Sequence, residues 1–345
     1  MVQSGDRGGA QRHVRDLARG MPRQTVGVVA GNGGWLMDEL GQGGVTTVVA
    51  PSLARSLDPI KVRRASAQVR QLAHQWGATI VHAHGVFALL ASVDAPLPLI
   101  YTTHGVQWTD RAHPAWLRSL SWSVHRALRS RVGAVVAVSE QEAREVEAVG
   151  VPRHCIHHIP NGVELTRGVP MVREPVCGVA ARLVAGKGLE DLITIMAELP
   201  RVNLRIAGDG PLRVRLEAHA ARLGVAARVH FLGWLDDLGP FYRGTAVYVT
   251  FSTKEGLPYT VLDAMAYGLP VVASDIPGHR ELVGQGRTGF LVDSRSAGAR
   301  RLAQLLADPG LRCQMGREAT AAIAERFSLQ AMLRAHSELY GTLAV

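Results

Sequence analysis

Two acidic residues flank a predicted helix start in the second half of the chain. Glu255 lies in a loop that follows a predicted strand, and Asp263 lies one to two turns into a helix expected to begin at Tyr259 or Thr260. Backbone N–H groups at a helix start favour an anion such as a diphosphate, and carboxylates accept hydrogen bonds from sugar hydroxyls. The spacing predicts that both acids reach different parts of one ligand; the alternative is that both are solvated surface residues.

Two basic residues lie five positions apart on another predicted strand-to-helix loop. Arg182 and Lys187 belong to a glycine-bearing turn that follows the apolar run 176–180. Two cations on such a loop can neutralise a departing diphosphate. The alternative is a structural or solvated pair.

Glycines open two further predicted strand-to-helix connections. Gly208 begins the sequence Gly-Asp-Gly-Pro, and Gly8 and Gly9 precede a helix in the first half. Because glycine lacks a side chain, the backbone there can approach a phosphate or a sugar closely. For Gly208 a plain turn is the alternative.

The pattern of elements that must position these residues is regular. Short β-branched runs alternate with longer amphipathic stretches, which is typical of parallel sheets covered by helices. The expected strands are residues 25–30, 46–50, 79–83, 99–103, 132–138, 176–180, 203–207, 229–232, 247–250 and 271–273. Prolines and turn residues between 160 and 175 indicate a boundary. We therefore predict an α/β fold of two Rossmann-like, doubly wound domains, with a ligand cleft between them beyond the carboxyl ends of the strands.

Composition and charge limit the class of protein. The 345 residues carry a formal net charge of +9, which favours anionic partners. Nucleic acid is disfavoured, because no recognition-helix, zinc-finger or aromatic-basic motif occurs. The three cysteines are too scattered for a zinc or redox motif. No apolar run is long enough to span a membrane and no signal-peptide pattern opens the chain, so a cytoplasmic location is expected.

Several histidines lie in or near predicted strands. His104 ends one strand, a position that favours a ligand contact, although a lone histidine is more often structural. His82 and His84 share one face of another strand, but no third ligand is expected nearby, so no metal site is predicted. A further group is expected in a solvated connecting loop: His154, His157 and His158.

One predicted helix combines tryptophans with arginines, as interfacial helices do. Its residues are Trp116, Arg118, Trp122, Arg126, Arg129 and Arg131. This composition favours peripheral attachment to anionic lipid at the inner face of the plasma membrane. The alternative is a core helix with solvated arginines.

The segment from Glu255 to Ser274 resembles the signature of glycosyltransferase family 4, a retaining family with the GT-B fold. Members read Glu-Gly-(Leu/Phe)-Pro, then a second acid eight residues after the first, then Ala-Met-Ala-x-Gly-x-Pro-Val-Val-Ala-(Thr/Ser). The loop of Arg182 and Lys187 is similar to the family's Gly-Arg-Leu-x-x-x-Lys-Gly element. His104 similarly matches (Thr/Asp)-x-His-Gly.

The glycine turns extend the likeness over nearly the whole chain. Gly8 and Gly9 match the family's Gly-Gly-Ala-(Gln/Glu), Gly208 matches Gly-(Asp/Glu)-Gly-Pro, and Phe231 lies in a strand that resembles the one bordering the base. The resemblance implies three parts. Residues 1–165 would bind the acceptor, residues 166–328 would bind the nucleotide sugar, and a helix within 329–345 would pack back on the first domain.

The resemblance also implies an activity and roles for the residues. The chain would transfer a hexosyl-type sugar from a nucleotide diphosphate sugar to a saccharide or lipid-linked acceptor, with retention, in polysaccharide, lipopolysaccharide or glycolipid synthesis. No metal or other cofactor is implied. Arg182 and Lys187 would hold the diphosphate, Glu255 the sugar hydroxyls, Asp263 the ribose, and His104 would lie near the anomeric carbon. Further substrate contacts would come from Gly8, Gly9, Gly208, Phe231, Gly256, Leu257, Pro258 and Tyr259.

Two departures from the family pattern leave alternatives open. Asp263 stands where members usually carry Glu, which is one methylene longer, and only Met1, Val2 and Gln3 precede the first loop. The first strand is therefore expected to be missing or truncated. The alternatives are a non-catalytic, sugar-nucleotide-binding partner subunit and a nucleotide-sugar epimerase or hydrolase of the same fold.

Overall fold

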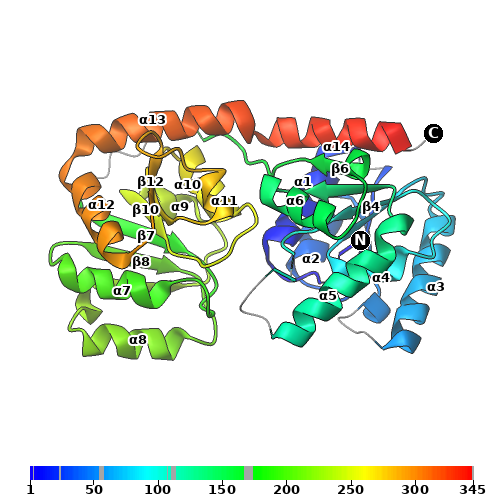
Figure 1. Ribbon diagram of the computed structural model, residues 1–345, viewed down its shortest axis with the longest axis horizontal. Helices are drawn as coiled ribbons and strands as arrows, with labels where there is room; N and C mark the ends of the chain where they lie inside the picture. Colours follow the sequence, from blue (N-terminus) through cyan, green and yellow to red (C-terminus); the bar gives the residue numbers. More distant parts are fainter. Residues whose placement is uncertain are drawn as a thin grey trace. The chain divides into compact units, whose positions relative to one another are not determined.

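The computed structural model describes residues 1–2, 4–22, 25–53, 58–106, 108–109, 114–166 and 174–343. Contacts within the chain divide it into two units (Figure 1). Unit 1 comprises Met1–Asn161 and Leu329–Val345, and unit 2 comprises Gly162–Ser328. Each unit has its own parallel sheet and its own apolar core.

Unit 2 is built on six parallel strands in the order β12-β11-β10-β7-β8-β9. They are β7 (Val176–Ala180), β8 (Asn203–Ala207), β9 (Val229–Gly233), β10 (Val247–Thr250), β11 (Val271–Ser274) and β12 (Gly289–Val292). The chain moves outward from β7 through β9 and then returns to β10 on the other side of β7. The strand order therefore reverses between β7 and β10, and ligands of doubly wound sheets bind at such a reversal.

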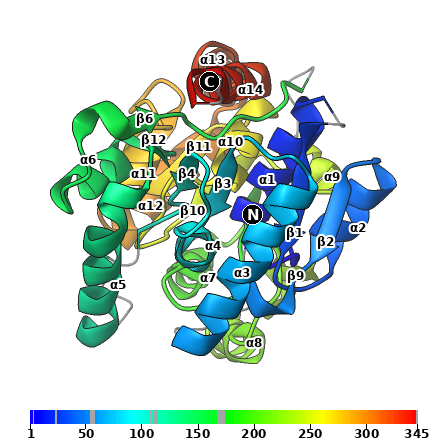
Figure 2. The same ribbon diagram turned by 90° about the vertical axis from the view of Figure 1, so that its right-hand side faces the viewer.

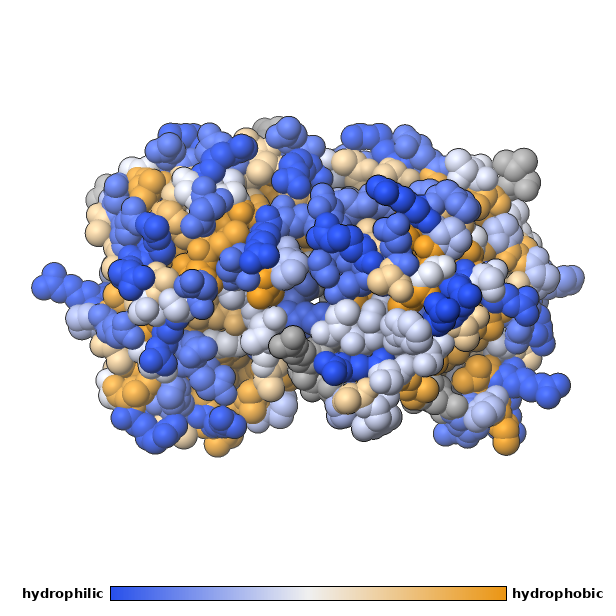
Figure 3. Space-filling model, viewed as in Figure 1, coloured by the Kyte–Doolittle hydropathy of each residue, from blue (hydrophilic) through white to orange (hydrophobic). Residues whose placement is uncertain are grey.

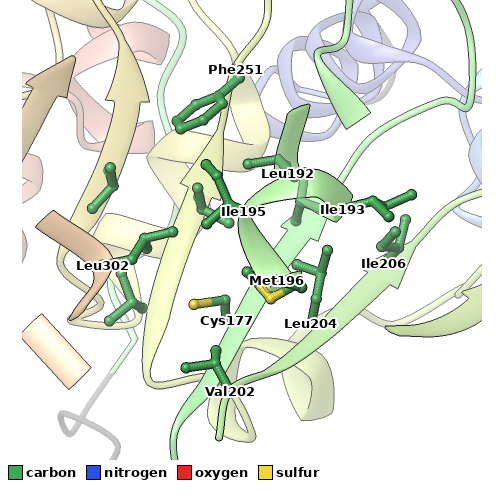
Figure 4. Close-up of a cluster of buried hydrophobic side chains, with 14 of the residues drawn as sticks. Cys177, Leu192, Ile193, Ile195, Met196, Val202, Leu204, Ile206, Phe251 and Leu302 are labelled. Carbon is green, nitrogen blue, oxygen red and sulfur yellow. The ribbon is translucent and has the colours of Figure 1, made fainter. Parts of the chain in front are cut away.

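The helices of unit 2 follow the strands in regular alternation. They are α7 (Leu189–Glu198), α8 (Arg213–Arg222), η5 (Ala226–Arg228), α9 (Gly239–Arg243), α10 (Tyr259–Ala266), α11 (Pro277–Arg280), α12 (Arg295–Ala307) and α13 (Pro309–Arg326). Figure 4 shows Cys177 of β7, Leu204 of β8 and Met196 of α7 in one cluster, and all three are fully buried. Burying a large apolar side chain stabilises a fold by about 1.5–3 kcal/mol. The core thus fixes the strands and the loops at their carboxyl ends.

Unit 1 also contains a parallel sheet, which Val2 links into one layer. The strands are β1 (Gly27–Ala30), β2 (Thr46–Val49), β3 (Val81–His84), β4 (Leu99–Thr102), β5 (Ala134–Ala137) and β6 (Ile156–His158). β1 pairs with β2, and β3 to β6 pair in sequence order. Val2, 1% exposed, forms parallel bridges to Ala30 of β1 and His84 of β3. This single residue lies at the place where the family resemblance implies a first strand.

Helices cover the sheet of unit 1. They are α1 (Gly9–Gly20), α2 (Trp35–Gln42), η2 (Pro51–Leu53), α3 (Pro59–Gln75), α4 (Val86–Ser92), α5 (Ala115–Leu128), η3 (Arg129–Arg131), α6 (Glu140–Ala148), η4 (Arg153–Cys155) and α14 (Leu329–Leu343). Figures 1 and 2 show α14 beside α1. Met332 and Leu339 of α14 share a buried cluster with Leu17 of α1 and Ile100 of β4. α14 is therefore part of the unit 1 core.

The structure confirms the predicted α/β class with parallel sheets in two units. Every predicted strand is present, and its ends differ from the prediction by two residues at most. β6 and β12 are not predicted. The expected connecting loop is wrong, because His154 lies in η4 and His157 and His158 lie in β6, where the backbone pairs with β5. His154 and His158 are nevertheless exposed, as expected for solvated residues.

None of the helices in the described part of the chain combines the length and the apolar character needed to cross a lipid bilayer. Figure 3 shows the face of the molecule that is seen in Figure 1. Hydrophilic side chains are spread over this face of each unit, interspersed with hydrophobic areas.

Candidate functional site

The loops after β7 and β10 make backbone contact at the strand-order reversal of unit 2. The N–H of Thr253 donates to the carbonyl oxygen of Gly186 over 2.9 Å. Gly188 has a φ of +63°, and a Cβ built there would lie 2.2 Å from the carbonyl oxygen of Phe251. Glycine is the residue that meets both demands without strain. The close approach brings Lys187 against the loop that carries Glu255.

Lys187 and Glu255 form an ion pair. The Nζ atom of Lys187 lies 2.6 Å from Oε1 of Glu255, and the two side chains are 22% and 18% exposed. Partial burial makes such a pair stronger than a fully solvated one. The structure therefore brings together two predicted site residues that are 68 positions apart in the sequence.

Helix α10 begins just after this pair. Its N-cap residue, Pro258, provides no side-chain cap, and the helix start retains the polarity that favours an anion. Gly278 of α11 packs closely against the loop before α10, because a Cβ built on Gly278 would lie 2.3 Å from the carbonyl oxygen of Gly256. Leu257 and Tyr259 are 4% and 7% exposed, so they pack the helix start against the unit.

Tyr248 of β10 lies near Glu255 and Asp263. The Tyr248 side chain is fully buried, and its hydroxyl lies 3.3 Å from the carbonyl oxygen of Ala180, the last residue of β7. Burial raises the pKa of Tyr248, and the negative charges of Glu255 and Asp263 raise it further. Glu255 and Asp263 thus lie on the same side of the sheet end as this hydroxyl, and Asp263 is half-buried.

The remaining predicted site residues of unit 2 lie near the carboxyl ends of the strands, as the Lys187–Glu255 pair does. Gly208 has a φ of +131°, and a Cβ there would lie 2.0 Å from the carbonyl oxygen of Ala181. The loop after β8 thus packs directly on the loop of Arg182, which is exposed and makes no ion pair within the described residues. Phe231 of β9 is half-buried and packs against the apolar core. Contacts of these residues with a substrate stay predictions.

His279 of α11 is a residue that the sequence does not single out. It is 0% exposed, and its Nδ1 lies 2.8 Å from the carbonyl oxygen of Ser274. Burial lowers the pKa of His279, while Glu255 raises it and Lys187 lowers it. His279 therefore lies close to the ion pair. The one sequence signal was its position just after β11, the next strand beside β10.

In unit 1, α1 begins at Gly9 with Gly8 as its N-cap. The helix start has no side-chain cap and no acidic residue in its first turn. The backbone of Gly8 is extended, and a Cβ there would meet only the flexible end of Gln11 at 2.6 Å. The packing of unit 1 therefore does not by itself require glycine at position 8, and the predicted substrate contacts of Gly8 and Gly9 stay predictions.

His104 adopts an unusual backbone conformation two residues after the end of β4. Its φ of +52° makes it the one non-glycine residue with positive φ in the part of the chain that the structure describes. Such strain is concentrated at functional sites. Its Nε2 lies 2.9 Å from Nδ1 of His84, and burial lowers the pKa of His104 to about 3. The residue as a whole is half-buried.

Other histidines surround His104 in unit 1. His13 of α1 and His84 of β3 lie with their ring centroids 4.9 and 5.2 Å from the ring centroid of His104. His336 of α14 lies 5.2 Å from His13, measured in the same way. Against expectation, two further histidines lie near His84, because one ring nitrogen each of His13, His84 and His104 lies within 4.8 Å of the others; His82 is not part of this group. The residues come from separate segments that only tertiary folding unites.

Glu142 of α6 holds the strand end that leads to His104. The hydroxyl of Thr103 donates to Oε2 of Glu142, and the N–H of Val138 donates to the same oxygen over 3.5 Å. Burial raises the pKa of Glu142 to about 7, against the opposing effect of the Thr103 hydrogen bond. This carboxyl group is therefore partly protonated near neutral pH.

We expect Glu142→Gln to remove a pH-dependent loss of stability. The folded state holds this proton more tightly than the unfolded chain, with a pKa of about 7 against 4.5. The stabilisation that the protonated Glu142 carboxyl group gives the folded state is thus complete below about pH 4.5 and is lost as the pH rises through 7. Between pH 5 and 8 the wild type should lose about 2–3 kcal/mol more unfolding free energy than the variant. Urea unfolding at pH 5 and pH 8 measures the unfolding free energy of both proteins. Equal losses in the wild type and in Glu142→Gln would contradict the raised pKa of Glu142.

Two family models match successive parts of the chain. The model described as "Glycosyltransferase Family 4" matches residues 7–167, and the model described as "Glycosyl transferases group 1" matches residues 170–322. The first match contains His104, and the second contains the Lys187–Glu255 pair and the start of α10.

Individual proteins show the same similarity. The lipopolysaccharide core biosynthesis glycosyltransferase LpsE of Rhizobium meliloti is 36% identical over 167 residues, which are 48% of this chain and 49% of LpsE, so the match spans about half of that relative. The lipopolysaccharide core biosynthesis mannosyltransferase LpcC of Rhizobium leguminosarum is 27% identical over 96% of this chain and 97% of LpcC. The crystal structure of Anabaena HepE in complex with UDP is 25% identical, with a TM-score of 0.84 over 99% of this chain and 98% of that chain.

Proposed function

Because this chain belongs to glycosyltransferase family 4, we propose that it transfers a sugar from a nucleotide diphosphate sugar to an acceptor, with retention of the anomeric configuration. The observation that carries the proposal is the Lys187–Glu255 ion pair beside the start of α10. A cation and a helix start suit a diphosphate, and a carboxylate next to them suits sugar hydroxyls. UDP bound to the similar HepE protein supports a nucleotide donor.

The reaction that we propose breaks the bond between the anomeric carbon and the diphosphate oxygen. The acceptor oxygen forms the new bond on the same face of the sugar, and its proton passes to the departing phosphate. The chain supplies orientation and neutralises charge. Lys187 and Arg182 stabilise the diphosphate, Glu255 positions the sugar hydroxyls, Asp263 holds the ribose, and His104 contacts the sugar.

The acceptor that we propose is a saccharide or a lipid-linked saccharide of a cell-surface polysaccharide, lipopolysaccharide or glycolipid. LpsE and LpcC support this class, because both carry lipopolysaccharide core biosynthesis in their names. The acceptor would bind unit 1, as the family resemblance implies.

A thermal-shift panel of UDP-, GDP-, ADP- and dTDP-sugars tests the proposal. A donor present at about 100 times its dissociation constant stabilises the chain by ~2.7 kcal/mol. The stabilising donor is then incubated with candidate acceptors, and proton NMR of the product reports the anomeric configuration. Inversion would refute retention. Binding without turnover would favour a non-catalytic partner subunit, and free sugar formed without an acceptor would favour a hydrolase.

Transfer is expected to need no divalent metal, because Lys187, Arg182 and the start of α10 meet the charge of the leaving group. Activity measured in excess EDTA should equal activity in Mg²⁺ within about twofold. Loss of activity in EDTA, restored by Mg²⁺ or Mn²⁺, would contradict this prediction.

We further propose that α5 attaches the protein to anionic membranes. Figure 2 shows α5 at the edge of unit 1. Ser121 and His125 anchor the helix and are buried, whereas Trp116 and Trp122 are 68% and 39% exposed. The Arg126 guanidinium lies 5.4 Å from the centroid of the Trp122 ring. Exposed indole rings beside arginines are typical of interfacial helices.

Replacing both Trp116 and Trp122 by Ala is expected to weaken binding to vesicles of anionic phospholipid by about 100-fold or more, since each buried indole contributes about 1.4 kcal/mol or more and each 1.4 kcal/mol is about tenfold in affinity. Co-sedimentation at low salt measures the bound fraction. Trp234→Ala, which removes a tryptophan that is 50% exposed in unit 2, is the matched control. Equal binding to the vesicles by the wild type, the double variant and Trp234→Ala would refute the role of α5.

A further inference from the structure

We propose that His13, His84 and His104 form a binding site for a divalent transition-metal ion, with Zn²⁺ as the best match to the ligands. One nitrogen of each side chain lies within 4.8 Å of the others. Zn²⁺ binds histidine nitrogen at about 2.0–2.1 Å, so nitrogens around one ion are about 3.3 Å apart. Nδ1 of His84 and Nε2 of His104 are already 2.9 Å apart. Side-chain rotations would bring the three nitrogens to the spacing that one ion requires and leave its fourth position open.

The three ligands are held by well-packed elements. His13 comes from α1, His84 ends β3, and His104 follows β4. The Nδ1 of His13 lies 3.0 Å from Oδ1 of Asn161. A hydrogen bond of this kind places the proton on Nδ1 and the lone pair on Nε2, and it orients the ring as the outer partners of metal-bound histidines do.

His336 supplies a second, independent observation. It is 0% exposed, and its Nδ1 donates to the carbonyl oxygen of Met332 over 2.9 Å. Its Nε2 is buried and has no hydrogen-bonding partner among the described residues. Buried polar atoms are nearly always satisfied, and the ring lies 5.2 Å from that of His13. His336 thus lies beside His13, next to the three nitrogens that lie within 4.8 Å of one another.

The donor set selects the class of metal. The cluster offers imidazole nitrogens and no carboxylate, which suits Zn²⁺, Co²⁺, Ni²⁺ or Cu²⁺ rather than Mg²⁺ or Ca²⁺. His82 is not a ligand, because Tyr340 and Thr102 each lie 2.7 Å from one of its ring nitrogens.

The consequence for activity rests on the proposed function. A metal-bound His104 cannot contact the donor sugar, so the ion inhibits transfer and takes no part in it. The site would make the enzyme sensitive to the free concentration of transition metal.

Titration of the metal-free, full-length chain with Co²⁺ tests the site without any activity assay. Visible ligand-field bands should grow to one Co²⁺ per chain, and Zn²⁺ should abolish them by competition. His104→Asn should weaken Co²⁺ binding by at least about 100-fold, since Asn tolerates the left-handed backbone at this position. His336→Gln should weaken it to a lesser degree. His74→Asn removes an exposed histidine of α3 and should change nothing.

Each result decides for or against the site. Absence of bands in the wild type, or bands that persist unchanged in His104→Asn and His84→Asn, would overturn it. Because a buried variant can fail to fold, circular dichroism is recorded for each, and Zn²⁺ should raise the melting temperature of the wild type but not of His104→Asn. Inhibition of sugar transfer by Zn²⁺ is measured last. A chain that binds Co²⁺ but transfers no sugar would refute the proposed function and leave the metal site standing.

Discussion

Lys187→Gln is expected to lower kcat/KM for sugar transfer by about 100- to 1,000-fold, which corresponds to about 2.7–4 kcal/mol of transition-state stabilisation. Lys187 is 22% exposed and held by Glu255 at 2.6 Å, so its charge is in place before the diphosphate develops negative charge. The loss should appear mainly in kcat, because the interaction strengthens as the bond breaks. Initial rates over a range of donor concentrations separate kcat from KM.

Lys61→Gln is the matched control, because it removes the same charge from an exposed position of α3. Glu255→Gln tests the other half of the pair. If Lys187 and Glu255 act as a unit, the double variant should lose much less activity than the product of the two single losses. Full activity in Lys187→Gln, with nucleotide binding unchanged, would remove the ion pair from the proposed mechanism.

The sequence predicted the loops of the site but not the contacts that join them. Arg182, Lys187 and Glu255 each follow a strand with a clear β-branched pattern, so their positions at the carboxyl ends could be read from local sequence. The meeting of Lys187 with Glu255 depends on how closely Gly188 approaches Phe251. The distance between Gly188 and Phe251 is set by the packing of the sheet, and no local sequence pattern predicts it.

The histidine cluster of unit 1 was beyond sequence reasoning for a similar reason. His84 and His104 lie at strand ends and attract notice, but His13 lies within a helix, and His336 lies in a helix more than 200 residues from both strands. The glycine pair at the start of α1 points to a phosphate or a sugar, not to a metal, and α14 has no motif that points to a ligand. Only the packing of α1 and α14 on the sheet brings these rings together.

Gly188→Ala is expected to destabilise unit 2 and to separate Lys187 from Glu255. Two effects combine at this position: the left-handed φ of +63°, and the carbonyl oxygen of Phe251, which would lie 2.2 Å from the added methyl group. The backbone oxygen belongs to Phe251, the residue directly after β10, and cannot rotate away, so one of the two loops must shift. The same shift would lengthen the ion pair and lower transfer activity.

Comparing Gly188→Ala with Gly224→Ala isolates the steric conflict with Phe251 from the left-handed strain. Gly224 also lies in unit 2 with a φ of +68°, but nothing lies within 4 Å of a Cβ built there. Both variants carry the left-handed strain of about 1–2 kcal/mol, and only Gly188→Ala adds the steric conflict, worth about 1–3 kcal/mol more. Its melting temperature should therefore fall by a further several degrees, at about 2–4 °C per kcal/mol for a domain of this size. Equal melting temperatures would show that the loops yield freely, and then the contact at Gly188 could not be what holds Lys187 against Glu255.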